Sequence, residues 1–372
     1  MKNNKYQAVV LGDSFNNTLG LIRSLGEAAV DIILILVAEE DRLFVSRSRY
    51  LKPHQIHTIN KIGESLDILK RVHNSSFKQY LICSNDRAAE FVDKHEVELS
   101  SMFITPMRGR RIGHFFNKDS QCRLAAQCGF SVPKSFTYHV NEVFPSNLDY
   151  PILLKPLNSN TGAKSDIHIC NSIDEVKICL KHQTVCTDFI VQEYIDKEYE
   201  LNLIGVRTDV GTFVPGGIQK LRHYPTIYSP CSYGLFQPLE VYNIDVDCIN
   251  RFLNEIGYYG PFSVELLHKN DKNYFMEFNF RHDGLAYTAT AAGCNLLGLY
   301  VYGGKTLPRP HSIYMMDLSI DYNHVKDGHI SFMSWMKDFL KTGCQLNFNR
   351  KDAFPTFSYY NEKLKRRLFS NW

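Results

Sequence analysis

Residues 260–281 read GPFSVELLHKNDKNYFMEFNFR, and this stretch has the form of a β-hairpin with charged residues in its apolar strands. Two runs rich in Phe, Val and Leu flank the segment KND, and each run carries one glutamate. Side chains alternate between the two faces of a strand. One face then carries the polar residues Ser263, Glu265, Glu277, Asn279 and Arg281. The other face, which we expect to meet the core, carries Phe262, Val264, Phe278 and Phe280.

The two glutamates of this hairpin need a partner. A carboxylate in an apolar strand is costly unless it is paired, and two carboxylates directly across a strand pair repel each other. A divalent cation between Glu265 and Glu277 would make the pair favourable, because Mg²⁺ prefers carboxylate and amide oxygens together with phosphate oxygens. The hairpin alone leaves a second interpretation open, in which both glutamates lie on a solvated face.

Length and composition exclude several classes of protein. The chain has 372 residues, of which 44% are hydrophobic, enough for two or three packed cores. It has 42 Lys and Arg against 39 Asp and Glu, and its only basic block is EKLKRR near the end. Nucleic acid is therefore not the expected partner.

The sequence also predicts neither a membrane span nor a disulfide framework. The apolar run DIILILVA at 31–38 is far shorter than the ~20 residues that cross a bilayer, and it is typical of a buried parallel strand. The ten cysteines form no CxxC pair. We expect reduced thiols in a cytoplasmic protein.

Three short apolar runs, at 6–11, 31–37 and 79–83, alternate with helical patterns such as the one at 17–29. This alternation predicts an N-terminal α/β unit of the doubly wound, Rossmann-like type. After a helix at 118–128 and a strand at 150–156 comes the small, polar loop 157–166. From 189 onward the pattern is mostly strand, which predicts an antiparallel sheet with helices on one side, an α+β layout. Residues 311–372 form an aromatic, partly helical extension.

Several polar residues in these elements suit a nucleotide. Lys155 lies in the apolar run ILLKP, where an ammonium needs an anionic partner, either a phosphate or a salt bridge. The segment QEYI ends a strand and can present backbone groups to an adenine edge; it comprises Gln192, Glu193, Tyr194 and Ile195. Glu200 can accept from ribose hydroxyls. We expect Lys220 and Arg222 to share one face of a strand, where either can neutralise a terminal phosphate.

In their order along the chain, these residues and the ending EFNFR resemble the ATP-grasp superfamily, in its carbamoyl phosphate synthetase-like, carboxylate–amine ligase branch. The resemblance implies that Lys118 and Lys155 hold the ATP phosphates, that Glu193 through Ile195 form the adenine hinge, and that Glu200 binds the ribose. It implies that Arg281 meets the acid substrate. The metal ligands it implies are Glu265, Glu277 and Asn279, with Mg²⁺ as the ion and Mn²⁺ as a substitute.

The resemblance also implies a division of the chain. Residues 1–112 would form a preATP-grasp α/β domain, 113–195 the small lid subdomain, 196–310 the large subdomain with the metal site, and 311–372 an extension. The loop 157–166 contains one glycine, where the family has a glycine-dense loop.

The activity implied is an Mg²⁺-dependent ligase. ATP would phosphorylate a carboxylate, and an amine would displace phosphate to give an amide, with release of ADP. The partners implied are a small carboxylate and an amine, with a homodimer as an open alternative to a monomer. HDGLAYTATAAGCN follows the arginine and favours amide formation over bicarbonate chemistry. Two other activities stay open: a carboxylating or carbamoyl phosphate-forming enzyme, and a nucleotide-binding regulatory protein without turnover.

Overall fold

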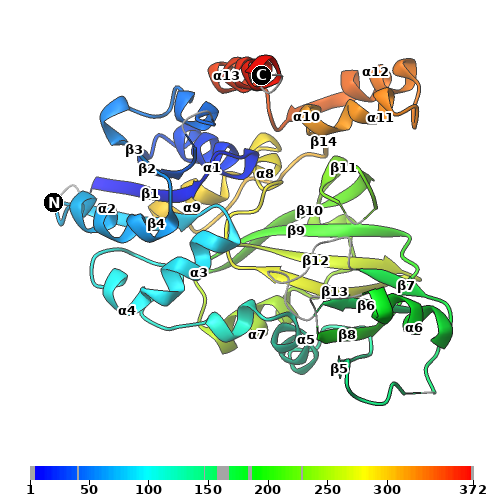
Figure 1. Cartoon of the computed structure of the whole chain (residues 1–372). Coiled ribbons are helices and arrows are strands. Elements are labelled where there is room, and N and C mark those ends of the chain that lie inside the picture. Colours follow the sequence, from blue (N-terminus) through cyan, green and yellow to red (C-terminus); the bar gives the residue numbers. More distant parts are fainter. Residues whose placement is uncertain are drawn as a thin grey trace.

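The chain folds around three β-sheets that follow one another in space (Figure 1). The structure, a computed structural model, describes residues 5–39, 42–145, 147–156, 167–182, 187–227 and 229–369. A parallel sheet lies at one end of the molecule, a small antiparallel sheet lies at the other, and the largest sheet lies between them.

The N-terminal sheet is parallel, with strand order β3-β2-β1-β4. Its strands are β1 (Lys5–Asp13), β2 (Asp31–Val37), β3 (Ile56–Ile59) and β4 (Phe77–Cys83). The helices of this region are α1 (Asn16–Glu27), α2 (Ser65–Val72), α3 (Asp86–Lys94) and α4 (Glu96–Leu99). The Rossmann-like prediction is confirmed. The sequence did not predict β3, because this short edge strand is only partly buried and lacks a continuous apolar run.

The second sheet is antiparallel, with order β5-β8-β6-β7. Its strands are β5 (Ser135–His139), β6 (Ile152–Pro156), β7 (His168–Cys170) and β8 (Asp188–Glu193), and its helix is α6 (Ile173–His182). Helix α5 (Lys118–Gln127) precedes it. The prediction that a single sheet begins at 189 is wrong, because β8 pairs with β5 and β6 instead of β9. The loop 157–166 lies outside the described residues.

The third sheet has the order β13-β12-β9-β10-β11-β14-β15. Its strands are β9 (Tyr199–Thr208), β10 (Gly211–His223), β11 (Cys231–Pro238), β12 (Pro261–Lys269), β13 (Lys272–Asn279), β14 (Ile313–Met316) and β15 (Thr342–Gln345). The helices associated with it are α7 (Val246–Ile256), α8 (Tyr287–Ala291) and α9 (Leu296–Tyr302). All neighbouring strands are antiparallel except β14 and β15.

The hairpin of β12 and β13 forms as predicted. Its turn consists of Asn270 and Asp271, whose φ angles of 50° and 57° are tolerated best by such short polar residues. The four apolar side chains expected in the core are buried in one cluster, and these are Phe262, Val264, Phe278 and Phe280. The opposite face is therefore free to carry the polar set.

The C-terminal extension is joined to the third sheet through β14 and β15, which the sequence did not predict. Its helices are α10 (Leu318–Asp321), α11 (Asn323–Lys326), α12 (Phe332–Lys341) and α13 (Phe354–Phe369). Short 3-10 helices complete the described structure at Phe44–Arg47, Pro53–Gln55, Ile62–Glu64, Gly113–Phe116 and Leu239–Val241. Within the described residues, no helix has the length and apolar character needed to cross a membrane.

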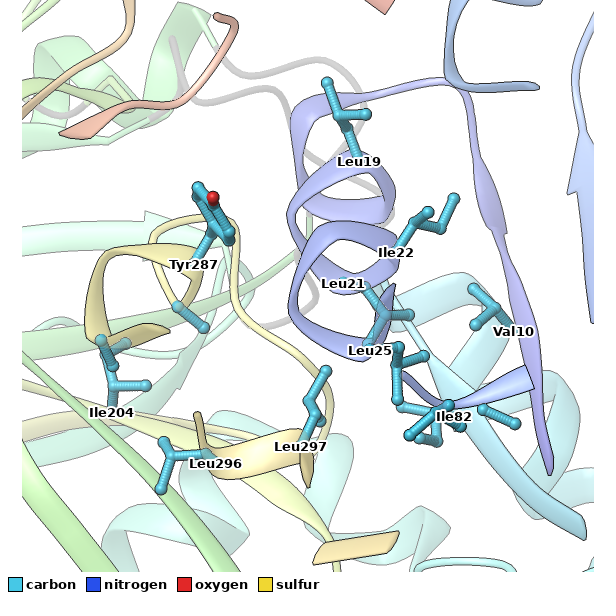
Figure 2. Packing of buried hydrophobic residues seen from close by; sticks show 14 of the residues in the cluster. Val10, Leu19, Leu21, Ile22, Leu25, Ile82, Ile204, Tyr287, Leu296 and Leu297 are labelled. Atoms are coloured by element: carbon cyan, nitrogen blue, oxygen red, sulfur yellow. The ribbon is translucent and has the colours of Figure 1, made fainter. Parts of the chain in front are cut away.

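Helix α1 joins the N-terminal sheet to the third sheet. Figure 2 shows side chains of α1 between two groups of apolar residues, Val10 and Ile82 on one side and Ile204, Tyr287, Leu296 and Leu297 on the other. All of them are buried and belong to one continuous core cluster. The apolar residues that recur at helical spacing in 17–29 therefore pack against both the N-terminal sheet and the third sheet. This core fixes how the N-terminal sheet meets the strands that carry the polar residues.

A buried ion pair ties the C-terminal extension to α1. Arg23 Nε lies 3.1 Å from Asp352 Oδ2, and both side chains are 0% exposed. Arg23 also donates to the carbonyl oxygens of Leu346 and Asp352, at 2.8 and 3.0 Å. Asp352 accepts from Ser48 Oγ and from the backbone N–H of Arg49. Neither charge has access to water, so each depends on the other.

We predict that Arg23→Met lowers the free energy of unfolding by about 3–5 kcal/mol, because it leaves the Asp352 carboxylate buried without its cation. Urea unfolding measures the loss. Arg42→Met is the matched control, since Arg42 pairs with Glu39 on the surface, where the side chains are 51% and 76% exposed. That change should cost less than about 1 kcal/mol. Equal losses in the two variants would contradict a structural role for the buried pair.

Candidate active site

A cavity of about 1010 Å³ brings together most of the polar residues singled out in the sequence. Strands β9, β10, β12 and β13 form one wall, and α3 and α5 contribute from the N-terminal half of the chain. The predicted residues that line it are Lys118, Glu200, Lys220, Glu265, Glu277, Asn279 and Arg281. The cavity therefore joins elements that lie far apart in the sequence.

Glu265 and Glu277 are directly opposite each other in the register of β12 and β13. Each is compensated by a lysine: Lys220 Nζ lies 2.8 Å from Glu265 Oε2, and Lys118 Nζ lies 3.2 Å from Glu277 Oε2. Burial would raise the pKa of Glu265, but Lys220 outweighs it and lowers that pKa. Glu277 is the main cause of the raised pKa of Lys118. Glu265 is thus held ionised at the cavity wall, and Glu277 lies beside a cation of its own.

The amide of Asn279 lies beside the two carboxylates in the same wall. Its Nδ2 donates to Ser263 Oγ at 3.1 Å, and its Oδ1 accepts from Arg281 at 3.1 Å. This orientation leaves one lone pair of Oδ1 available. The described residues contain no group of three or more His, Cys, Asp or Glu that could hold a metal. Two carboxylates and an amide oxygen fit Mg²⁺, which takes one or two protein carboxylates and fills its other positions with phosphate oxygens and water.

Glu200 lies between two lysines on the wall of the cavity. Its carboxylate bonds to Lys197 Nζ and lies 3.1 Å from Lys220 Nζ. Burial alone would raise the pKa of Glu200, but these two cations lower it. Lys220 bridges Glu200 and Glu265, and the two carboxylates raise its pKa against the effect of burial. Lys220 therefore stays charged at the centre of the site.

Arg222 is not brought to the cavity with Lys220. Its guanidinium bonds to Asp321, at 2.9 and 3.1 Å, and to Asp338 at 2.6 Å, and it stacks on the ring of Tyr233. The expectation of a shared face fails because β10 has a register irregularity between Lys220 and Arg222, which interrupts the alternation of side chains. The structure uses Arg222 to bind the C-terminal extension.

Lys155 makes no ion pair with any described residue, so the salt-bridge alternative has no partner in this part of the chain. Its Nζ donates instead to Gln192 Oε1 at 3.0 Å. Burial of the ammonium, together with the nearby Lys118, lowers the pKa of Lys155 to about 8. Because burial disfavours the charged ammonium of Lys155, an anion bound beside it would be stabilising.

The segment from Gln192 to Ile195 ends β8. The backbone N–H of Glu193 donates to the Lys134 carbonyl oxygen at 2.8 Å, and that of Tyr194 donates to the Pro151 carbonyl oxygen at 3.3 Å. Ile195 is buried, and its N–H meets no acceptor among the described residues. Of the three hinge amides, that of Ile195 is therefore the one left to bind a ligand.

Arg281 holds a carboxylate of the N-terminal unit. Its Nε and Nη2 lie 2.7 and 3.1 Å from the two oxygens of Asp86, at the start of α3. This forked contact raises the pKa of Arg281, although burial acts the other way. Sequence reasoning missed Asp86. It follows β4 at the carboxyl edge of the parallel sheet, next to the point where the strand order reverses, and ligand sites of such sheets lie there.

Comparisons with known proteins identify a domain in the part of the chain that carries most of this site. Residues 123–295 match the model of the ATP-grasp domain. The formate-dependent phosphoribosylglycinamide formyltransferase of a Nitratiruptor species is 31% identical over 196 residues, which cover 50% of this chain and 47% of that protein. The enzyme of the same name from Bacillus velezensis is 29% identical over 187 residues, covering 47% and 46%. The chain spans about half the length of the curated relatives it matches.

Two solved structures show the same fold at low identity. The N5-carboxyaminoimidazole synthetase of Staphylococcus aureus has a TM-score of 0.62 at 13% identity and covers 88% of each chain. The L-amino acid ligase of Bacillus licheniformis has a TM-score of 0.58 at 12% identity and covers 84% of this chain and 80% of its own. At such identities the likeness concerns the fold alone. The chain therefore carries an ATP-grasp domain over residues 123–295 and has the fold of the ATP-grasp superfamily, with a Rossmann-like unit before that domain.

Proposed function

We propose that this protein is an ATP-dependent carboxylate–amine ligase that releases ADP and phosphate. The observation that carries the proposal is the pair Glu265 and Glu277, directly opposed in register and flanked by Lys220 and Lys118 in one cavity with Arg281. Phosphoryl transfer is catalysed mainly by positioning and by cations around the transferred group, and this cavity concentrates both.

Lys118, Lys155 and Lys220 bind the phosphates of ATP in this proposal, and the N–H of Ile195 meets the adenine edge. Glu200 accepts from the ribose. Glu265, Glu277 and Asn279 hold Mg²⁺, which supplies neutralisation of phosphate charge when it is bound. Lys118 and Lys220 already neutralise these acids in the structure, so they are placed to turn to phosphate oxygens once the acids have another cation.

Arg281 orients the carboxylate that accepts the phosphoryl group. Its planar fork already holds a carboxylate with two bonds, that of Asp86, and this contact supports the assignment. Asp86 is 58% exposed and can swing away at little cost. The acid substrate then takes its place. The amine, in its neutral form, attacks the acyl carbon of the phosphorylated acid. The bond from this carbon to the phosphate oxygen breaks, and phosphate and a proton leave.

The names of the relatives support a small carboxylate and an amine as the substrate classes. The curated relatives are named as formate-dependent enzymes that act on phosphoribosylglycinamide. Among the neighbours of similar fold are N5-carboxyaminoimidazole synthetases, which favours a carboxylating enzyme as the second candidate. The carboxylates expected to bind the ribose and the metal, Glu200, Glu265 and Glu277, all line the cavity. Their presence argues against a regulatory protein without turnover.

We extend the proposal to the organisation of the protein. Residues 1–112, 113–195 and 196–310 act as the preATP-grasp, small and large units, with 311–372 as an extension that completes the large sheet. The nine cysteines that the structure describes are free, which supports a cytoplasmic location. The oligomeric state proposed is a monomer or homodimer, distinguished by light scattering.

The first prediction for this function concerns the metal ligands. Glu277→Gln should lower ADP release by more than about 100-fold, because even outer partners of a metal are worth 10–100-fold. Thermal unfolding should stay near wild type, since the side chain is 33% exposed at the cavity wall. Glu240→Gln, at an exposed ion pair with Arg309, is the control and should keep full activity. Full turnover of Glu277→Gln at ordinary Mg²⁺ would refute the metal assignment.

A second prediction follows from the lowered pKa of Lys155. Phosphate favours the charged ammonium, so ATP binding should weaken as pH rises above about 8, the pKa of this lysine. Lys155→Met should bind ATP about 10–100-fold more weakly and lose this pH dependence. The folded-state pKa lies below the usual value for lysine, so the charged form costs stability below pH 8, and the variant should be no less stable at pH 7. A large loss of melting temperature with unchanged ATP affinity would contradict the phosphate role.

The third prediction tests the acyl phosphate itself. Hydroxylamine should replace the natural amine and yield a hydroxamate together with ADP and phosphate, only when the correct acid is present. We would screen formate, pooled amino acids and small dicarboxylates. AMP and pyrophosphate as products would contradict the mechanism, since they indicate an acyl adenylate. ADP release that needs bicarbonate and no organic acid would favour the carboxylating candidate.

A further inference from the structure

The cavity extends from the paired glutamates to the N-terminal sheet and to the C-terminal extension. Four carboxylates line this part, and we call it the acidic end: Asp86, Glu90, Asp283 and Asp317. Asp86 and Glu90 belong to α3, Asp283 follows Arg281 in the chain, and Asp317 directly precedes α10. Three separate segments of the protein therefore place negative charge at one place.

The cations of the cavity do not compensate for this charge. The described lining contains eight carboxylates and four cationic side chains. Each of the four cations is already engaged by carboxylates: Lys118 by Glu277, Lys220 by Glu265, Arg111 by Asp93, and Arg281 by both Asp86 and Asp283. Glu90 and Asp317 form no ion pair with any described residue. In the proposed function Lys118 and Lys220 turn to ATP and Arg281 to the acid substrate, so among the described lining residues no cation at the acidic end is left for a phosphate group on the amine.

Asp317 is the carboxylate that the extension contributes to the described lining of the cavity, and 8% of the residue is exposed. Its Oδ2 accepts from Asn16 Nδ2 at 2.8 Å, and its Oδ1 accepts from the backbone N–H and the hydroxyl of Ser319, at 3.0 and 2.5 Å. Burial raises the pKa of Asp317. Its Oδ2 still has a lone pair to offer, and a cation in the cavity would relieve the cost of burying the charge.

Asn202 provides an independent sign of a ligand. This residue is 1% exposed and lines the cavity from β9, next to Glu265 in the register. Its Nδ2 donates to Asp283 at 3.1 Å, but its Oδ1 is buried and accepts no hydrogen bond from any described residue. A buried acceptor without a donor costs about 1–3 kcal/mol. An N–H group of a bound molecule would satisfy it.

We propose that the amine substrate is a cation without a phosphate group, and that Asp317 and the Oδ1 of Asn202 accept hydrogen bonds from its ammonium group. The C-terminal extension thus supplies a carboxylate that selects the substrate. This inference rests on the proposed function, in which the amine is the second substrate. It separates the chain from relatives that are named for a phosphoribosyl substrate, because a phosphate would meet uncompensated carboxylates here.

Binding of amines to the full chain tests the inference without turnover. Calorimetry with Mg²⁺ and a non-hydrolysable ATP analogue would compare ethanolamine, glycinamide and 1,4-diaminobutane with phosphoethanolamine, which differs from ethanolamine only by its phosphate. At least one cationic amine should bind, and ethanolamine should bind at least about 10-fold more tightly than phosphoethanolamine. Tighter binding of phosphoethanolamine, or no binding of the three cationic amines, would overturn the inference.

Asp317→Asn separates substrate binding from a purely structural role. Asparagine still caps a helix, so α10 should form, while the loss of charge should weaken binding of the cationic amines about 10-fold or more. Asp245→Asn is the matched control, because Asp245 caps α7 in the same way, at 2.9 Å from the N–H of Asp247, and lies outside the cavity. If both variants bind the amines equally well, Asp317 is only a helix cap.

A competition assay distinguishes the failure of this inference from that of the proposed function. Hydroxylamine is uncharged at neutral pH, so it reports on acyl phosphate formation without using a site for cations. The ratio of amide to hydroxamate formed from a mixture of amine and hydroxylamine should fall about 10-fold or more in Asp317→Asn. An unchanged ratio would overturn the inference alone. Absence of hydroxamate in the wild-type protein with every acid would instead refute the proposed function.

Discussion

The constraint on which the site depends is the compensation of two carboxylates that face each other across one hairpin. Glu265 and Glu277 are held in register by the ladder between β12 and β13, so they cannot move apart without breaking the sheet. The protein resolves the repulsion with Lys220 and Lys118, which come from two other elements. The hairpin therefore requires its neighbours, and the placement of β10 and α5 follows from its charge as well as from its apolar face.

The remaining ion pairs of the site follow the same rule, in which each charge lies beside an opposite charge. Glu200 shares Lys220 with Glu265, and Arg281 bridges the hairpin to Asp86 in the N-terminal unit. Such a network holds several charges in a partly buried cavity because each has an opposite charge within bonding distance. Lys155 is the exception among the described residues: it bonds to the neutral Gln192, and burial together with the nearby Lys118 lowers its pKa. An anion bound beside Lys155 would stabilise its charged form.

The fold supplies the rigidity that this network needs. Helix α1 buries one apolar face against both the parallel sheet and the α8–α9 region, which fixes the angle between two sheets. The fully buried pair Arg23 and Asp352 then attaches the C-terminal extension to the same helix. Arg222 secures the extension from the other side through Asp321 and Asp338. The segment with no readable role in the sequence thus becomes one wall of the cavity, through Asp317 and Leu346.

The local pattern of apolar and polar residues determined many of the helices and strands of this protein. The alternation of side chains in GPFSVELLHKNDKNYFMEFNFR determined the hairpin, its buried face and the meeting of Glu265 with Glu277, because strand geometry alone sets these. Apolar runs of strand length separated by helical periods determined the parallel N-terminal sheet. Tertiary structure alone decided the rest: that β8 joins a separate sheet, that Arg222 pairs with the extension, and that Asp86 reaches Arg281. These depend on contacts between segments up to 195 residues apart. A periodic pattern records which face of an element is buried, but it does not record which distant element covers that face.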